Sequence, residues 1–205
     1  MDNSTLMHGT ARIEQALQAL GEILSARQQE IAIVLIGGAA LNLLGFVQRP
    51  TRDVDILAFG AAPGAFPPLP IIEPPTPMPA SLIDGIRLVA GELRLTADWL
   101  NTGPALQWKQ GLPPGLEARV HWRRYGALTV GLVDRYDLIF FKLYAAADAT
   151  GPQSRHYQDL FRLNPNRTEI EAAVRWVTEQ DPTPSFAEVV DRVVNYLASD
   201  LAAYE

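Results

Sequence analysis

Apolar and polar positions along the first sixty residues follow periods that predict alternating helices and strands. Apolar residues recur at helical spacing over 10–27, which predicts an amphipathic helix. The run "IAIVLI" at 31–36 is short, continuous and rich in β-branched residues, which is typical of a buried strand. A short helix is expected over 38–46 and must end before Pro50, because proline disfavours helical geometry at the preceding residue. The stretch "DVDILAF" at 53–59 then predicts a second strand.

Proline dominates the next stretch, because residues 63–79 hold eight of the sixteen prolines in the chain. We expect a surface loop without regular structure here, since proline lacks the backbone N–H that a sheet needs. A polyproline ligand for another protein is the weaker alternative. Helical spacing returns over 80–93, and 117–125 and 128–133 predict two strands joined by a tight turn at Gly126.

The pattern is helical from Asp137 onward. An apolar helix that begins there carries a single lysine, Lys142. The stretches "TEIE" at 168–171 and "SFAE" at 185–188 match the capping box found at helix starts. The two helices predicted from these starts span 169–180 and 186–203.

These elements together predict an α/β (α+β) fold, in which a short mixed sheet is flanked by helices and followed by a helical C-terminal region. We expect an α/β domain over residues 1–135, with the proline-rich loop at 63–79, and a helical region over 136–205 packed on it. The length of 205 residues suits one domain with such an extension.

Composition and charge argue against several functional classes for this chain. The net charge of −6 and the pI of about 5.1 argue against the broad basic surface of a nonspecific nucleic-acid binder. The chain contains no cysteine, which excludes disulfides, thiolate chemistry and cysteine-ligated zinc. No apolar run reaches the roughly 18 residues of a membrane helix, and the N-terminus shows no secretory signal. We therefore expect a cytoplasmic protein with no membrane partner.

The strand predicted at 53–59 carries two acidic residues at alternate positions. Side chains on a strand alternate between faces, so Asp53 and Asp55 share one face while Val54 and Ile56 share the other. Two like charges on a half-buried strand repel each other and lose hydration unless a cation compensates them. Hard oxygen ligands without nearby histidine or cysteine suit Mg²⁺ or Mn²⁺. The alternative is a solvated strand edge.

A pair of glycines, Gly37 and Gly38, stands where the first strand ends and the short helix begins. Glycine lets backbone amides approach a phosphate closely, and a helix N-terminus favours the anion. A glycine pair alone is more commonly a simple turn. Its order and spacing relative to the two aspartates favour a metal site beside a phosphate site, which is what nucleotidyl transfer needs.

The stretch "GGAALNLLGFVQRPTRDVDIL" resembles the signature of the nucleotidyltransferase superfamily, in which a glycine pair is followed by a strand with two alternating carboxylates. It is most similar to the branch that includes the AbiEii-type and MenT-type toxins. The resemblance is specific over residues 35–57, although the fourteen residues between Gly38 and Asp53 are slightly more than is usual. The residues that carry it are Gly37, Gly38, Ala40, Leu41, Arg49, Thr51, Asp53 and Asp55.

The resemblance implies an enzyme that uses Mg²⁺ or Mn²⁺ and a nucleoside triphosphate (NTP) to transfer a nucleotide to an acceptor hydroxyl. The implied nucleotide-binding residues are Gly37, Gly38, Arg49 and Thr51, and the implied metal ligands are Asp53 and Asp55. The acceptor would be the 3′ end of tRNA or a protein hydroxyl, and the acidic pI weighs toward a protein. A toxin–antitoxin system is implied, with a cognate toxin or antitoxin protein as partner.

Two further catalytic positions follow from a softer match in "DLIFFKLYAAAD" and "RHYQDLFRL". It places Lys142 and Asp159 where those toxins carry a lysine on a helix after the sheet and a later aspartate. Lys142 would bind the triphosphate as a point charge, and the alternative is that its amine reaches the surface along the helix. Asp159 could equally pair with Arg155 or Arg162. We expect His156 to have a structural role.

The superfamily also uses a third carboxylate on a later strand, which would act on the acceptor proton. Asp98 in "LTADWLN" is the catalytic candidate, and Glu117 is the second choice. Asp98 could instead be a helix or turn residue. A catalytically inactive module that binds a nucleotide or a partner protein is therefore the alternative to an enzyme.

Overall fold

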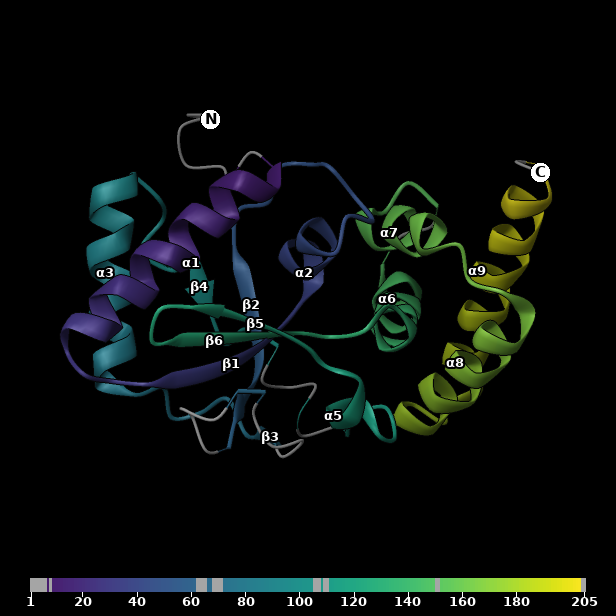
Figure 1. The fold of residues 1–205 in the computed structure, drawn as a ribbon. Coiled ribbons are helices and arrows are strands. Elements are labelled where there is room, and N and C mark those ends of the chain that lie inside the picture. Colours follow the sequence, from purple (N-terminus) through teal and green to yellow (C-terminus); the bar gives the residue numbers. More distant parts are fainter. Residues whose placement is uncertain are drawn as a thin grey trace. The chain divides into compact units, whose positions relative to one another are not determined.

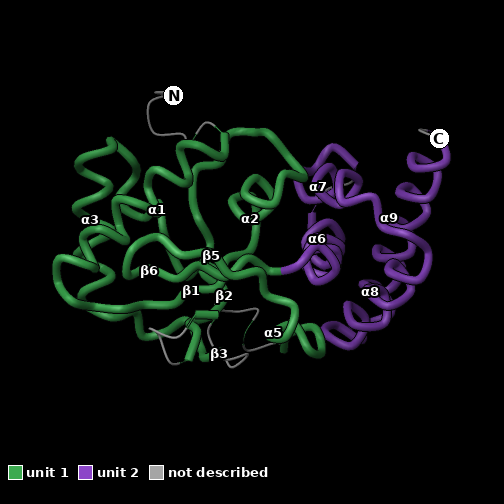
Figure 2. Tube along the Cα trace, in the orientation of Figure 1, with its two compact units in different colours: residues 1–133 green, residues 134–205 purple. Residues whose placement is uncertain are grey.

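The computed structural model describes residues 7, 9–61, 66–67, 72–104, 108, 111–149 and 152–203. The chain divides into two compact units, residues 1–133 and residues 134–205 (Figure 2). The boundary falls between the last strand and the helices that follow it. Within the described ranges, no helix is both long enough and apolar enough to cross a membrane.

The first unit is built on a mixed, open sheet (Figure 1). Its strands are β1 Ile31–Ile36, β2 Val54–Gly60, β3 Ile72–Glu73, β4 Leu100–Asn101, β5 His121–Tyr125 and β6 Leu128–Leu132. The order is β3-β2-β1-β6-β5, and β4 pairs with β2 as well. β1 is the central strand of this order. It pairs antiparallel with β2 on one side and parallel with β6 on the other.

Helices of the first unit share one hydrophobic core with this sheet. They are α1 Gly9–Ala26, α2 Gly37–Leu43 and α3 Ala80–Leu93. The unit also contains the short helix α5 Leu116–Arg119. The apolar stripe of α1, including Leu17, is fully buried against alternate strand residues such as Ile33, Leu35 and Val130. Each such side chain contributes about 1.5–3 kcal/mol when it is fully buried. The expected α/β class with a helical C-terminal region is confirmed.

The proline-rich stretch contains a short strand, so the prediction that it lacks regular structure is wrong. Ile72 and Glu73 form β3, which pairs antiparallel with Gly60 and Phe59 of β2. Neither residue is a proline, so both keep the N–H that pairing needs, and the strand lies at the edge of the sheet, where neighbouring prolines are tolerated. The rest of the prediction falls partly on 63–65 and 68–71, outside the described residues.

The strand predicted over 117–125 begins with a helical turn instead. The N–H of Leu116 donates to the carbonyl of Pro113 at 3.1 Å, and the N–H of Ala118 donates to that of Gly115 at 3.1 Å. These bonds shape the turn that enters α5, and β5 begins only after the extended residue Val120. Local hydrogen bonds around Gly115, whose φ is +73°, therefore overrode the strand-like composition.

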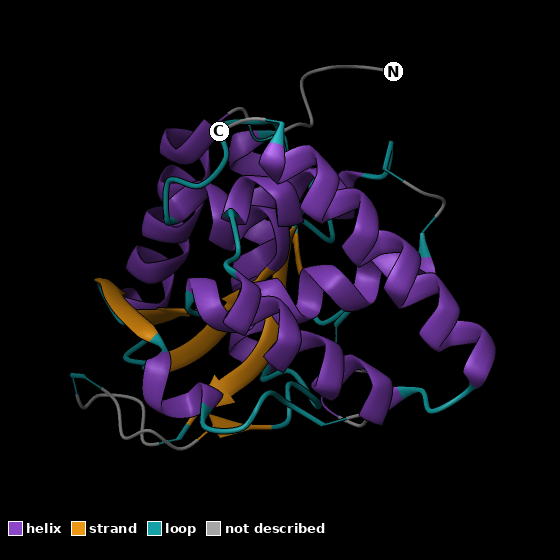
Figure 3. Ribbon diagram, turned by 90° about the vertical axis from the view of Figure 1, so that its right-hand side faces the viewer, coloured by secondary structure: helices purple, strands orange, loops and turns teal. Residues whose placement is uncertain are grey.

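Every regular element in the described part of the second unit is a helix (Figure 3). These helices are α6 Arg135–Asp148, α7 Arg155–Leu163, α8 Arg167–Gln180 and α9 Pro184–Ala202. Trp176 of α8 lies at the centre of an aromatic cluster with Phe140 and Phe141 of α6, at ring-centroid distances of 5.9 and 5.7 Å. Such contacts add about 0.5–1.5 kcal/mol each beyond the area they bury.

Both predicted capping boxes are displaced from the real helix starts. α8 begins after Asn166, whose side chain accepts from the N–H of Glu169 at 3.0 Å while the Glu169 carboxylate accepts from the N–H of Asn166 at 2.8 Å. Thr168 therefore lies inside the helix. α9 begins after Thr183 with Pro184 in its first turn, so Ser185 is not its cap.

Replacing Glu169 with glutamine should destabilise the second unit, because it removes the negative charge that pairs with Arg135. The Glu169 carboxylate accepts two hydrogen bonds from Arg135, at 2.6 and 3.1 Å, and glutamine keeps the capping geometry without the charge. We expect a loss of about 1 kcal/mol at neutral pH in urea unfolding, as for a charge-assisted pair that is partly exposed.

The same variant has a defined pH signature. Burial alone would raise the pKa of Glu169, but hydrogen bonds from Arg135 and the Asn166 backbone, together with the charge of Arg135, lower it below the ordinary 4.5. The stabilisation is therefore present above the unfolded-state pKa and is lost as pH falls through the folded-state pKa. The difference from Glu169→Gln should therefore shrink steadily as the solution is acidified below the unfolded-state pKa. A difference that stays constant with pH would contradict this account.

Candidate functional site

The turn after β1 brings a glycine into direct contact with an aspartate. Gly37 has a φ of +76°, in the left-handed region that favours glycine. The antiparallel register of β1 and β2 pairs Ile36 with Asp55, so the Asp55 carboxylate lies beside this turn. A Cβ on residue 37 would lie only 2.5 Å from Oδ2 of Asp55. The backbone conformation therefore favours glycine at this position, and an added Cβ would force the Asp55 carboxylate to move.

The second glycine leaves room for two polar side chains from the segment before β2. A Cβ on Gly38 would lie 3.2 Å from the hydroxyl oxygen of Thr51 and 3.3 Å from a guanidinium nitrogen of Arg49. Thr51 is buried, and its hydroxyl donates to the carbonyl of Asp53 at 3.1 Å. The predicted nucleotide-binding residues and Asp55 thus lie close together at the end of β1, and Asp53 joins them through its backbone carbonyl. We call this set the glycine-end cluster: Gly37, Gly38, Arg49, Thr51, Asp53 and Asp55.

Sequence reasoning missed Asn42, the residue that ties this cluster together. It lies in α2 and is only 1% exposed. Its amide nitrogen donates to the carbonyl of Gly38 at 2.9 Å, and its amide oxygen accepts from the N–H of Arg49 at 3.3 Å. The available signal was a single amide inside the apolar run "GAALNLLGF", because a buried amide needs hydrogen-bond partners.

The two aspartates take the positions that strand alternation predicts. Asp53 immediately precedes β2 and Asp55 is its second residue, and both are half-buried. Val54 and Ile56 are fully buried in the core on the other face. The acidic pair therefore lies outside the hydrophobic core, where a polar ligand can reach it.

The strand β4 carries an amide beside Asp55, and not a third carboxylate. On β4, the residue in register with Asp55 is Asn101, and in-register neighbours project side chains from the same face of a sheet. The oxygen of the Asn101 side chain accepts from the N–H of Gly103 at 2.6 Å. Asp98, the expected carboxylate, lies exposed in the turn before β4, and Glu117 lies in the first turn of α5.

The acidic pair suits a hard divalent cation by the chemistry of its donors. Among the residues that the structure describes, no group of three or more histidine, aspartate or glutamate side chains is arranged to hold a metal ion. Mg²⁺ is commonly bound by one or two carboxylates while water and substrate phosphates complete its coordination. Asp53 and Asp55 therefore fit a cation that arrives with a nucleotide.

The two remaining predicted site residues form a buried ion pair in the second unit. Nζ of Lys142 in α6 donates to Oδ2 of Asp159 in α7 at 2.8 Å, and the two side chains are 7% and 2% exposed. The alternative that Lys142 extends to the surface is therefore wrong. Arg155, Arg162 and His156 are exposed on α7, and the buried carboxylate of Asp159 pairs with the lysine.

Replacing Gly37 with alanine should destabilise the fold and displace Asp55. A positive φ costs a non-glycine residue about 1–2 kcal/mol, and the new methyl group would also collide with the carboxylate. Gly45 is the matched control, because its φ is +84° and no atom lies within 4 Å of its Cβ position. In chemical unfolding, we expect Gly37→Ala to lose about 1–2 kcal/mol more than Gly45→Ala. Equal losses would show that Asp55 is not held against Gly37.

Comparison of the chain with known protein families, with curated proteins and with solved structures finds no match.

Proposed function

We propose that this chain is a metal-dependent nucleotidyltransferase whose active site is the glycine-end cluster. One observation carries the proposal: the Asp55 carboxylate packs against Gly37 while Arg49 and Thr51 pack against Gly38. One end of the sheet thus holds carboxylates that suit a cation and a guanidinium that suits phosphate. It also holds two glycines, whose backbone a ligand can approach closely. Structural turns need the glycines but do not need this combination of charges.

Each group has a role that its chemistry supports. Asp53 and Asp55 would hold Mg²⁺ or Mn²⁺ together with the triphosphate of an NTP. Arg49 would pair with phosphate oxygens through its planar guanidinium, close to the amides of Gly37 and Gly38. The bound cation would lower charge repulsion on the phosphates and favour ionisation of the acceptor hydroxyl.

The proposed reaction transfers a nucleoside monophosphate. The acceptor oxygen forms a bond to the α-phosphorus, the bond from that phosphorus to the bridging oxygen of the β-phosphate breaks, and pyrophosphate leaves. The acceptor hydroxyl releases its proton. The acceptor is the 3′ end of tRNA or a protein hydroxyl, and the chain's acidic character favours the protein. By its resemblance, such an enzyme would be a toxin with a cognate antitoxin.

A labelling experiment tests the proposal. The purified chain is incubated with each of the four NTPs, labelled at the α-phosphate, in Mg²⁺ or Mn²⁺, with total tRNA or with a protein extract as acceptor. We expect label in one acceptor class, abolished by a chelator. Absence of labelled product with every NTP and both acceptors would reject an enzyme of this kind.

Asn101 favours a second candidate, a catalytically inactive module that binds a nucleotide or a partner protein. An amide in register with Asp55 cannot take up the acceptor proton as a carboxylate can. In that case, calorimetry should detect metal-dependent NTP binding without labelled product. Growth on expression separates the roles further, because a toxin arrests growth when expressed alone and an antitoxin does not.

A further inference from the structure

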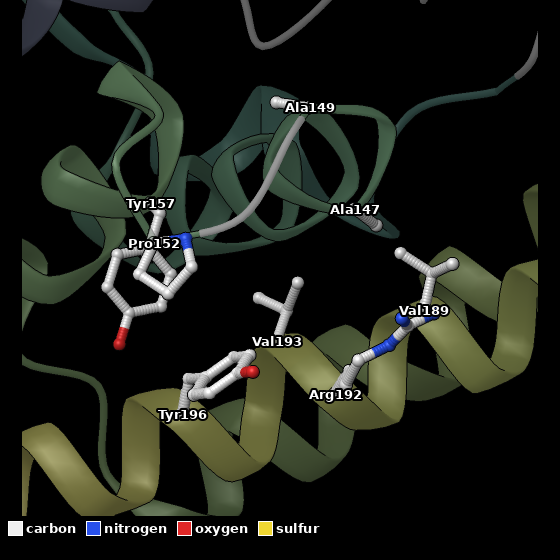
Figure 4. Close-up of a pocket in the computed structure, with 8 residues that line it drawn as sticks. All are labelled: Ala147, Ala149, Pro152, Tyr157, Val189, Arg192, Val193 and Tyr196. Atoms are coloured by element: carbon white, nitrogen blue, oxygen red, sulfur yellow. The ribbon is translucent and has the colours of Figure 1, made fainter.

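A pocket of about 350 Å³ lies within the second unit, away from any residue assigned a role above. One wall comes from Ala147 at the end of α6 together with Pro152 and the α7 residue Tyr157. The other wall is one face of α9, and Figure 4 shows Val193 and Tyr196 on that helix facing the first wall. The pocket is at the lower end of the range of small-molecule sites, about 300–1,000 Å³.

The walls of this pocket are mostly apolar and aromatic. Val193 is 5% exposed and Tyr157 is 2% exposed, so both belong to the packed interior of the unit. Tyr196, in contrast, is 49% exposed, which is unusual for so large an aromatic side chain. Val189, Val193 and Tyr196 follow helical spacing, so they present one continuous face of α9 to the pocket. A flat apolar ring would bury apolar surface between these side chains.

The pocket has one cationic position. Arg192 lines it from α9 in an exposed position, and within the described ranges its guanidinium makes no hydrogen bond or ion pair. The pocket residue Tyr157 engages the carboxylate of Asp200, because its hydroxyl donates to Oδ2 of that residue. Burial and the Asp200 carboxylate both raise the pKa of Tyr157, so this phenol keeps its proton and its bond at neutral pH. Charge complementarity therefore favours an anionic group at Arg192.

The geometry points to a binding site for a small aromatic anion, a single planar ring that carries a carboxylate or a phosphate. The ring would lie between Val193, Tyr157 and Tyr196, and the anion would pair with the Arg192 guanidinium. The site uses only residues of the second unit, so it does not depend on nucleotidyl transfer at the glycine-end cluster.

Binding of simple probes to the full-length chain tests the site. Benzoate and phenyl phosphate represent the two anion types, benzyl alcohol lacks the charge, and acetate lacks the ring. Ligand-observed NMR titration gives the dissociation constants. Arg192→Met removes the charge and keeps the apolar stem, and Arg175→Met, on the exposed side of α8, is the matched control.

We expect at least one aromatic anion to bind to the wild type and to Arg175→Met with equal affinity, and at least tenfold more weakly to Arg192→Met. The anion that binds more tightly distinguishes a carboxylate from a phosphate ligand. Tyr196→Ala should also weaken binding, because it removes a ring face from the pocket. The inference is overturned if neither anion binds at millimolar concentration. It is also overturned if benzyl alcohol binds the wild type as tightly as the anion does, or if Arg192→Met binds the anion as tightly as the wild type does. Melting curves confirm that each variant is folded.

Discussion

Lys142→Met is expected to destabilise the protein by about 3–5 kcal/mol. The substitution removes the cation that faces Asp159 at 2.8 Å and leaves a carboxylate that is 2% exposed without its charge partner. Removing one member of a buried pair is costly because the remaining charge has lost its hydration and no longer gains the attraction of the opposite charge. Urea unfolding of the wild type and the variant measures the loss.

Two controls separate this effect from ordinary loss of a contact. The double variant Lys142→Met, Asp159→Leu replaces both charges with apolar groups and should return to within about 2 kcal/mol of the wild type. Arg167 and Glu171 form an exposed pair at the same 2.8 Å distance, so Arg167→Met should cost less than about 0.5 kcal/mol. If Lys142→Met unfolds like the wild type, burial of the pair does not govern its energy.

The folded double variant also tests the catalytic roles that the resemblance implies for Lys142 and Asp159. If the lysine binds the triphosphate, transfer falls at least about tenfold, or on the order of 1.4 kcal/mol in the transition state. If the pair only supports the helices of the second unit, transfer is unchanged while stability is retained. Single variants cannot give this answer, because their loss of stability would itself lower transfer.

The double variant Asp53→Asn, Asp55→Asn should lose metal-dependent nucleotide binding and lower transfer by at least about a thousandfold, or roughly 4 kcal/mol. Asparagine keeps the size of each side chain but removes the charge that would hold a divalent cation. Both aspartates lie outside the hydrophobic core, so the melting temperature should change little.

Titration calorimetry with Mn²⁺ and a nonhydrolysable NTP measures the binding directly. Asp84→Asn is the control, because this aspartate lies exposed on α3 and its side chain is 57% accessible. We expect the control to bind and react like the wild type. Unchanged binding in the double variant would show that the two aspartates do not hold the metal, and it would reject the proposed function.

Sequence alone determined most of the elements, because apolar period and run length are local properties. The run at 31–36 matches β1 and the helical spacing at 80–93 matches α3 at both ends. Over 80–93 the apolar residues fall on one face only in a helix, and the short length and β-branched content of 31–36 favour a strand. The same local reasoning found the glycine pair and the alternating aspartates, because strand ends and strand faces follow from the pattern.

Short and polar features depended on tertiary structure. β3 and β4 have two residues each and no period of their own, and they exist because the edge of β2 offers backbone hydrogen-bond partners. Capping boxes at 168–171 and 185–188 fit the sequence rule, yet Asn166 and Thr183 begin the helices. Competing caps differ by about 1 kcal/mol or less, so the path of the preceding chain decides between them.

The partners of the polar side chains were also a tertiary outcome. The sequence supplied Gly37 and Asp55 to neighbouring strand ends, but the register of β1 and β2 put the carboxylate against the glycine. It supplied Lys142 to an apolar helix, but the packing of α6 on α7 paired it with Asp159. A side chain's partner depends on strand register and helix packing, and both are set by the burial of the whole core.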